Sequence, residues 1–548
     1  MKRLLIICIL LSPIAIKAEE GLDKKIDNAF QPISNFFSDL VFYEIGGYPF
    51  VIFLLVGSAV FFSLYFMFPN IRYFGKSINV VRGKYDDIES NDDELDDGEV
   101  SHFQALTTAV SGTVGNGNIA GVALAIAVGG PGATFWMIVC GLLGMSTKFV
   151  ECTLGVKYRD IGKDGTVFGG PMYYLSKGLK EKGFVNFGKI AAILFAIFCI
   201  GGSFGGGNAA QSNQAAAVVK GLFDFHSDGS GAIIGIVMAI LVGLIIIGGI
   251  KRIASVTEKI VPFMAILYIL ACIYILSINY SFIDDAIGLI FSEAFNPKAI
   301  GVGGVIGVLM VGFKRAAFSN EAGAGSASIA HSAVKTKYPA SEGLVALLEP
   351  FIDTVVICTM TALVIITFNN SDINNQQFTY GDMANEKFEN VEYIDIDNDG
   401  KEEYVIKLPD ANDEMVFQKV KGKVLVDNKL LEGAEITQEA FAKYIPFSQI
   451  FLALAVFLFA ISTMISWSYY GLQSWKYLFG RGKLADMTYK VIFLLFIVIG
   501  SAASMDSIWA FSDAMIFAMV FPNMIGLFFL FPVVKNELNR YLKAIRNK

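Results

Sequence analysis

The sequence predicts an all-α integral membrane protein of about eleven transmembrane helices with one small β-rich insertion. Of the 548 residues, 54% are hydrophobic and 17% are charged, whereas soluble domains carry about 25% charged residues. Apolar runs of about 20 residues, the length that crosses a bilayer, recur from end to end. Glycine (54) and phenylalanine (47) are abundant, which is typical of helices that pack closely in lipid.

The first 18 residues have the pattern of a secretory signal peptide. Lys2 and Arg3 precede an apolar run from Leu4 to Ile16, and Ala18 is a candidate cleavage point. The run is too short to cross a bilayer of about 30 Å comfortably, which favours a cleaved signal peptide. The alternative is a short helix that is not cleaved. In either case, the segment that follows starts outside the cytoplasm.

The apolar runs that follow define the predicted spans. By length they are 49–68, 104–128, 131–151, 189–219, 231–250, 256–278, 301–330, 343–368, 447–468, 487–504 and 507–534.

Lysine and arginine in the loops predict the orientation. With the N-terminus outside, every loop rich in these residues lies inside, from Arg72–Lys84 to the tail after Lys535. The alternate loops, such as 224–231 and 279–285, are poor in them. An odd number of spans places the two termini on opposite sides of the membrane, which agrees with a signal peptide that leaves the N-terminus outside. The signal peptide and the basic inner loops suit a bacterial inner membrane.

One sizeable polar segment, residues 369–445, interrupts the spans on the outer side. Alternating residues in 403–408 and 423–426 predict short strands. Asp395, Asp397 and Asp399 resemble the start of a weak calcium loop, but Ile406 stands where glutamate would complete it, so an Asp-rich turn is the favoured alternative. The predicted domains are a signal (1–18), a membrane domain in two parts (19–368 and 446–535), the insertion (369–445) and a tail (536–548).

Two spans contain glycine-rich segments, residues 111–121 and 318–326. Glycine costs about 1 kcal/mol relative to alanine inside a helix, so glycines clustered with Ser, Thr and Asn predict an unwound helix. In a bilayer, unwound backbone survives only against protein or a watery cavity, where its free polar groups can bind ions. Close helix packing is the alternative. Because the two segments occupy matching places in two halves, we favour a transporter's binding site.

The sequence argues against other classes of function. It shows no metal-ligand spacing, no GxSxG motif and no nucleophile–base pair, so no catalytic residue and no organic cofactor are expected. It shows no basic face for a nucleic acid. The histidines His102, His226 and His331 lie near span ends, and no buried chain of Asp, Glu and His is apparent, which argues against a proton relay.

Six stretches of the chain resemble the alanine or glycine:cation symporters, the sodium:alanine symporter family. They are residues 111–123, 169–174, 206–212, 249–254, 312–326 and 348–354. The resemblance implies a leucine-transporter-like (LeuT-like) fold, an inverted five-plus-five repeat, here with one extra N-terminal helix. It also implies Na⁺-coupled uptake of alanine or glycine. The insertion is not typical of the family. A proton-coupled symporter and a membrane substrate sensor are the alternatives.

The substrate candidates follow from the two breaks and the resemblance. The first break would hold the substrate carboxylate and the second its ammonium group, while Trp467 would cap the pocket or anchor the interface. Asn208, a costly amide in lipid, would bind substrate or bond between helices. The full set is Thr113, Gly115, Gly117, Asn118, Asn208, Phe318, Ser319, Asn320, Gly323 and Trp467.

The sodium candidates are oxygen ligands in the pattern that the fold implies. They are the carbonyls of Ala109 and Val110 and the hydroxyls of Ser462, Thr463 and Ser466, which could instead bond to their own helix. Three acidic residues are given structural roles. Glu321 could support the unwound backbone, and Glu349 and Asp353 could form ion pairs at the cytoplasmic end.

Overall fold

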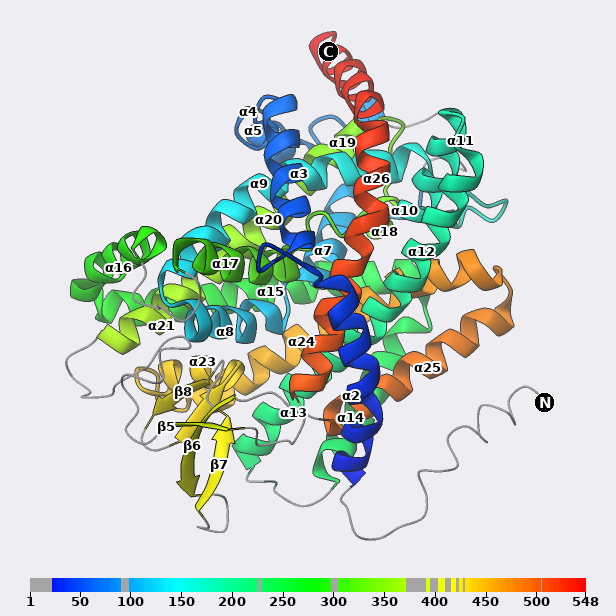
Figure 1. The fold of residues 1–548 in the computed structure, drawn as a ribbon. Helices are drawn as coiled ribbons and strands as arrows, with labels where there is room; N and C mark the ends of the chain where they lie inside the picture. The colour runs from blue at the N-terminus through cyan, green and yellow to red at the C-terminus, as the bar shows by residue number, and fades with distance from the viewer. Residues whose placement is uncertain are drawn as a thin grey trace.

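The computed structural model is a mostly helical protein (Figure 1). It describes residues 22–89, 98–223, 225, 229–296, 304–370, 391–394, 403–409, 415–419, 423–426, 429–503 and 505–548. The predicted signal peptide, His226 and the calcium-loop candidates Asp395, Asp397 and Asp399 lie outside these residues.

Within the described chain, seven helical segments are long and apolar enough to cross a membrane. They are α9 (Gly132–Lys157), the run of α12 and α13 (Val185–Phe223), α15 (Gly249–Ile278), the run from α19 to α21 (Pro339–Phe368), α24 (Ser448–Phe479), α25 (Lys483–Ala502) and most of α26 (Ile508–Arg546). An eighth is a bent pair, α7 (His102–Thr113) with Asn116–Gly129, which includes α8 (Ala120–Gly129).

The three remaining predicted spans also coincide with helices, but these helices are shorter. They are α3 (Phe50–Tyr65), with 16 residues, and α14 (Ser230–Ile246) and α17 (Gly304–Asn320), with 17 residues each. By length and composition the structure therefore supports seven or eight spans, and the prediction of eleven is not confirmed.

The other α-helices of the described chain are mostly short. They are α2 (Leu22–Val41), α4 (Pro69–Arg72), α5 (Phe74–Val81), α6 (Asp86–Glu89), α10 (Pro171–Tyr173), α11 (Leu179–Glu181), α16 (Ile283–Phe295), α18 (Ser328–His331), α20 (Leu348–Pro350) and α23 (Ala434–Ala442).

The predicted strands are confirmed. An antiparallel sheet joins β5 (Val391–Ile394), β6 (Glu403–Pro409) and β7 (Met415–Lys419), and a hairpin joins β8 (Lys423–Val426) to β9 (Lys429–Glu432). Two more hairpins are very short, β1 (Glu44–Ile45) with β2 (Tyr48–Pro49) and β3 (Asp160–Ile161) with β4 (Val167–Phe168).

The strands and the C-terminal tail lie at opposite ends of the bundle. Figure 1 shows β5 to β8 and α23 at the bottom, and the end of α26 with α4, α5 and α19 at the top. The basic loop after α3 and the basic tail therefore share one end, as the orientation argument requires. Which end faces the cytoplasm stays a prediction.

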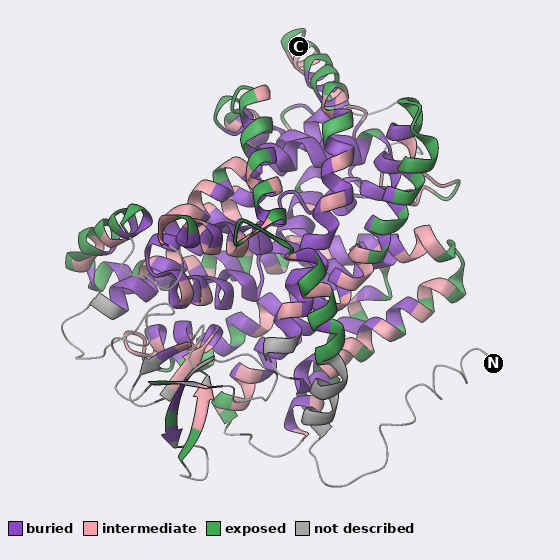
Figure 2. Ribbon diagram, in the orientation of Figure 1, coloured by how far each residue is buried: buried purple, intermediate pink, exposed green. Residues whose placement is uncertain are grey.

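The burial pattern is that of a protein in lipid. Ile240 of α14 and Ile266 of α15 are 59% and 58% exposed, whereas Lys148 of α9 is fully buried. Figure 2 shows the exposed residues on the outer helices around a buried interior. Because apolar residues face outward and charges face inward, the outer surface matches a bilayer and the interior holds the functional groups.

Candidate functional site

The first glycine-rich segment breaks its helix. α7 ends at Thr113, the chain turns at Gly115 and a short turn at Asn116–Asn118 leads into α8, with a bend of 59° between the two parts. The side-chain oxygen of Asn118 accepts the Gly115 N–H at 2.9 Å, and that of Gln211 accepts the Asn116 N–H at 3.0 Å. Side-chain amides thus replace the lost helical hydrogen bonds.

The second segment also breaks its helix. α17 ends at Asn320, and the chain is non-helical until α18 begins at Ser328. Gly323 (φ 97°) and Glu321 (φ 53°) both have left-handed backbone. Glycine takes this conformation freely, whereas glutamate is strained in it and must be held by its surroundings. Both predicted interruptions are therefore present in the structure.

Trp467 of α24 joins the two breaks. Its indole N–H lies 3.2 Å from the Gly112 carbonyl at the end of α7 and 3.0 Å from Oε1 of Glu321. The other oxygen of Glu321 accepts the Ser326 hydroxyl. Glu321 thus supports the unwound backbone. Trp467 is 1% exposed, so the alternative of an interfacial anchor is wrong.

Asp353 also joins the two breaks. It lies in a π-helical segment, Phe351–Cys358, at the centre of the run from α19 to α21. Its carboxylate accepts the Asn118 amide at 2.6 Å from the first break and the Ser319 hydroxyl at 2.9 Å from the second, and Thr354 donates at 2.7 Å. Among the described residues, no basic side chain forms an ion pair with it. The predicted role of Asp353 as half of an ion pair is therefore wrong.

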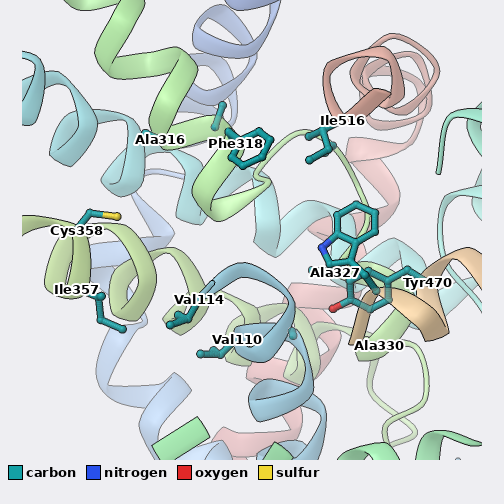
Figure 3. Close-up of a cluster of buried hydrophobic side chains, with 14 of the residues drawn as sticks. Val110, Val114, Ala316, Phe318, Ala327, Ala330, Ile357, Cys358, Tyr470 and Ile516 are labelled. Carbon is teal, nitrogen blue, oxygen red and sulfur yellow. The ribbon is translucent and has the colours of Figure 1, made fainter. Parts of the chain in front are cut away.

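Phe318 packs at the centre of this region. Its ring centroid lies 5.0 Å from that of Trp509, and a methyl placed on Gly117 would lie 3.6 Å from its ring. In Figure 3, Phe318 at the end of α17 lies across the cluster from Val110 and Val114 at the end of α7. The two breaks thus face each other through buried side chains.

The remaining substrate candidates are less central. Asn208 lies in a π-helical turn, Gly205–Ala209, and its amide donates to the Phe493 carbonyl of α25 at 2.7 Å, which is the helix–helix bond that we gave as its alternative. Gly323 donates to Glu151 of α9 at 2.9 Å. Asn320 donates to Thr354 at 2.9 Å. Gln211 contacts the first break more closely than Asn208 does.

The sodium candidates fall into two groups. The Thr463 hydroxyl reaches the first break, 3.0 Å from the Ser111 carbonyl, whereas that of Ser462 bonds to its own helix at Phe459. The Ser466 hydroxyl is buried and has no hydrogen-bond partner among the residues that the structure describes. The carbonyls of Ala109 and Val110 lie 3.4 and 3.3 Å from the Thr113 hydroxyl. The structure thus brings α24 against the first break, and the ligand set itself stays a prediction.

A buried chain of histidines and glutamates was missed by the sequence analysis. The carboxylate of Glu342 in α19 lies between His102 and His331. Its Oε1 is 2.5 Å from Nδ1 of His331, and its Oε2 contacts Nδ1 of His102. Nε2 of His102 lies 2.7 Å from Glu89, and both histidines are buried. The expectation that no such chain exists is wrong, because helices that are distant in sequence pack together and enclose these span ends.

The predicted ion pair of Glu349 is present. Its carboxylate lies 3.0 Å from Lys148 of α9, and both side chains are fully buried. The second carboxylate oxygen lies 3.6 Å from Nε2 of His331, which joins this pair to the histidine chain.

Known proteins resemble this chain along most of its length. The model of the sodium:alanine symporter family matches residues 30–391 and 415–548. Within the predicted insertion, only residues 392–414 fall outside the match, so the departure from the family there is smaller than the predicted insertion. The chain is 37% identical to the sodium/alanine symporter AgcS of Methanococcus maripaludis, over 91% of this chain and 96% of that one.

Two further similarities are more distant. The chain is 34% identical to the putative sodium/proton-dependent alanine carrier protein YrbD of Bacillus subtilis, over 88% of this chain and 87% of that one. The solved structure of MhsT in complex with L-phenylalanine is 13% identical, with a TM-score of 0.44, covering 81% and 99% of the two chains. The family match covers nearly the whole chain, and the relatives it resembles are transporters and not enzymes. The chain is a member of the sodium:alanine symporter family.

Proposed function

We propose that this protein takes up a small neutral amino acid, alanine or glycine, together with sodium by alternating access. One observation carries the proposal: two broken helices face each other across a buried carboxylate, Asp353, that accepts hydrogen bonds from both breaks. A buried charge is costly unless it is paired. No basic group among the described residues pairs with Asp353, so a bound cation is the partner that the site lacks.

The broken helices suit a zwitterion. The N-terminus of α8, with the short turn before it, presents the positive end of a helix dipole, and the C-terminus of α17 presents a negative end. The substrate carboxylate would bind at Thr113, Gly115, Gly117 and Asn118, and the ammonium group at Phe318, Ser319 and Asn320. Half-helices in transporters bind substrate and ion in this way.

The buried aromatic side chains support a small substrate. Phe318 and Trp467 are 5% and 1% exposed beside the breaks, which leaves little room for a large side chain. Alanine and glycine are therefore the proposed substrates, and AgcS is named for alanine. Asn208 and Gly323 remain in the proposed set at its edge.

Sodium has two proposed positions. The first is at Asp353 with the side-chain oxygens of Asn118 and Ser319. The second is the predicted set at Ala109, Val110, Ser462, Thr463 and Ser466, of which Thr463 and the unpartnered Ser466 hydroxyl face the interior. Both positions supply the hard oxygen ligands that sodium requires.

The remaining features of the proposal concern architecture and place. We assign an inverted five-plus-five repeat preceded by one helix, in a bacterial inner membrane, with the N-terminus and the insertion outside and the tail in the cytoplasm. The proposal includes the predicted domains: the signal (1–18), the membrane domain (19–368 and 446–535), the insertion (369–445) and the tail (536–548). The opposite positions of the strands and the tail in Figure 1 support this orientation.

Proton coupling in place of sodium is the second candidate. The buried chain of His102, Glu342 and His331 favours it, because such chains carry protons in pumps and transporters. The name of the Bacillus subtilis relative includes both ions.

The deciding experiment uses purified protein in vesicles with labelled alanine. Accumulation is expected only when sodium is higher outside than inside, at equal pH on the two sides. Equal accumulation with potassium in place of sodium would refute sodium coupling, and accumulation driven by a pH gradient alone would establish the second candidate.

A further inference from the structure

One buried cluster of charged side chains lies next to the second break and takes no part in the proposed binding of substrate or sodium. We name it the glutamate–histidine cluster, and its members come from α6, α7, α9, α18, α19 and α20. They are Glu89, His102, Lys148, Glu151, His331, Glu342 and Glu349, and each is at most 7% exposed.

The cluster contains more acid than base. It has four carboxylates but only three basic groups, Lys148 and the two imidazoles. Even with both imidazoles protonated, one negative charge is left over. Since an unpaired buried charge costs several kcal/mol, the cluster favours holding its protons at neutral pH. This excess of acid, together with the contacts of Glu342 with both imidazoles, points to a proton-binding site.

The protons hold together elements that belong to both broken helices. His102 is the first residue of α7, and His331 is the last residue of α18, which follows the second break. Glu342 of α19 binds one imidazole with each of its oxygens. A protonated imidazole makes each contact an ion pair, whereas a neutral one leaves the carboxylate without a counter-charge.

A cavity gives water access to one end of the cluster. Its volume is about 250 Å³, and its lining includes Asp86, Glu89, Ser101, His102 and Lys335. Lys335 is exposed, and its backbone N–H pairs with Val100 beside α7. The cavity lies at the end of the bundle that carries α4, α5 and the tail. Protons can thus reach Glu89 and His102 from that side.

We propose that the glutamate–histidine cluster is a proton-operated latch that closes this end of the transporter, an inference that rests on the proposed function. With both imidazoles protonated on Glu342, the ends of α7 and α18 are held together and the site is closed toward the cavity. When His102 loses its proton through Glu89 to water, the carboxylates of Glu89 and Glu342 lose the positive charge between them. Repulsion between the two carboxylates then opens the latch.

Other charged and titratable groups face the latch from the elements packed around it. Asp86 and Lys335 line the cavity, and Tyr541 of the tail helix donates to Glu89. Arg159, in the loop after α9, donates to the Ser332, Val334 and Thr336 carbonyls. The remaining groups are Lys148, Glu151 and Cys152 of α9, Glu321 of the second break, Tyr174, and Tyr470 of α24.

The test is exchange of labelled for unlabelled alanine across vesicles, with sodium and pH equal on the two sides. No gradient drives this exchange, so its rate reports opening and not coupling. For the wild type, we expect the rate to rise with pH by up to about tenfold per pH unit, the limit for one proton, at pH values above about 8, because the contacts with Glu342 and Glu89 favour the protonated imidazoles.

Two variants remove the latch. Glu342→Gln and His331→Gln cannot form the ion pair, so their exchange is expected to be fast and independent of pH. The matched control is Glu537→Gln, which breaks the Lys157–Glu537 pair outside the cluster and should keep the wild-type profile. Wild-type pH profiles in both latch variants, or a flat profile in the wild type, would overturn the latch.

A further variant covers loss of folding. If neither latch variant folds, Lys335→Gln is measured instead, since this exposed residue lies on the cavity. Removing the positive charge of Lys335 favours binding of protons by the cluster. The pH profile of exchange by this variant is therefore expected to shift to higher pH, and an unshifted profile overturns the latch. If the wild type exchanges no alanine at any pH, the proposed function fails and the latch fails with it.

Discussion

Replacing Asp353 by asparagine removes the one charge that both breaks share. The side chain keeps nearly the same shape, and its amide oxygen can still accept from Asn118, 2.6 Å away in the wild type. The Ser319 and Thr354 hydroxyls, which donate at 2.9 and 2.7 Å, can rotate and accept from the new NH₂ group. The cost in folding free energy is therefore expected to be small, about 1 kcal/mol.

The effect on sodium is expected to be much larger. Two unit charges 4 Å apart attract by about 4 kcal/mol at an effective dielectric constant of about 20, and about 1.4 kcal/mol corresponds to a tenfold change in affinity. Some of this attraction is recovered by the amide dipole. The sodium concentration for half-maximal alanine uptake should therefore rise about a hundredfold to a thousandfold.

The assay is the initial rate of alanine uptake into vesicles as a function of external sodium. The matched control is Asp513→Asn, because Asp513 is also buried but is paired with Lys314 and Arg315 at 2.9 and 2.8 Å. The control should lose stability and keep its sodium dependence. Wild-type sodium dependence in Asp353→Asn, with the protein folded, would refute the reasoning that a buried carboxylate between the breaks binds the cation.

Three further substitutions test the breaks themselves. Asn118→Ala removes the acceptor of the Gly115 N–H and the donor from the first break to Asp353, so we expect uptake to be lost; uptake at the wild-type rate would remove Asn118 from the site. Gly323→Ala should lower stability by about 1–3 kcal/mol, because φ is 97° and the new methyl would lie 2.3 Å from a leucine of α3; an unchanged unfolding temperature would contradict this. Trp467→Phe removes the N–H that joins the two breaks, so both stability and uptake should fall, and a fall in neither would show that this link is dispensable.

Much of the fold could be predicted from the sequence, because the relevant signals are local. A run of apolar residues as long as the bilayer is thick can only be a helix there, since lipid satisfies no backbone group. Every predicted span coincides with a helix, and the strands in 403–408 and 423–426 are present. The second glycine-rich segment breaks its helix with left-handed backbone, which glycine takes at little cost, as at Gly323.

Some local readings needed correction. The helices α3 and α14, of 16 and 17 residues, are each shorter than a full span, which hydropathy alone did not reveal. Only residues 392–414 of the insertion lie outside the family match. A boundary set by hydrophobicity marks where lipid contact ends and not where the helix does.

The sequence by itself determined which segments enter the membrane and where two of them unwind. Only the tertiary structure decided that Asp353 joins Asn118 to Ser319, that Trp467 lies inside the bundle, and that His102 and His331 share Glu342. Hydropathy and glycine content act over a few neighbouring residues. The partners of a buried charge depend instead on which helices pack together, and His102 and Glu342, for example, lie 240 positions apart in the chain.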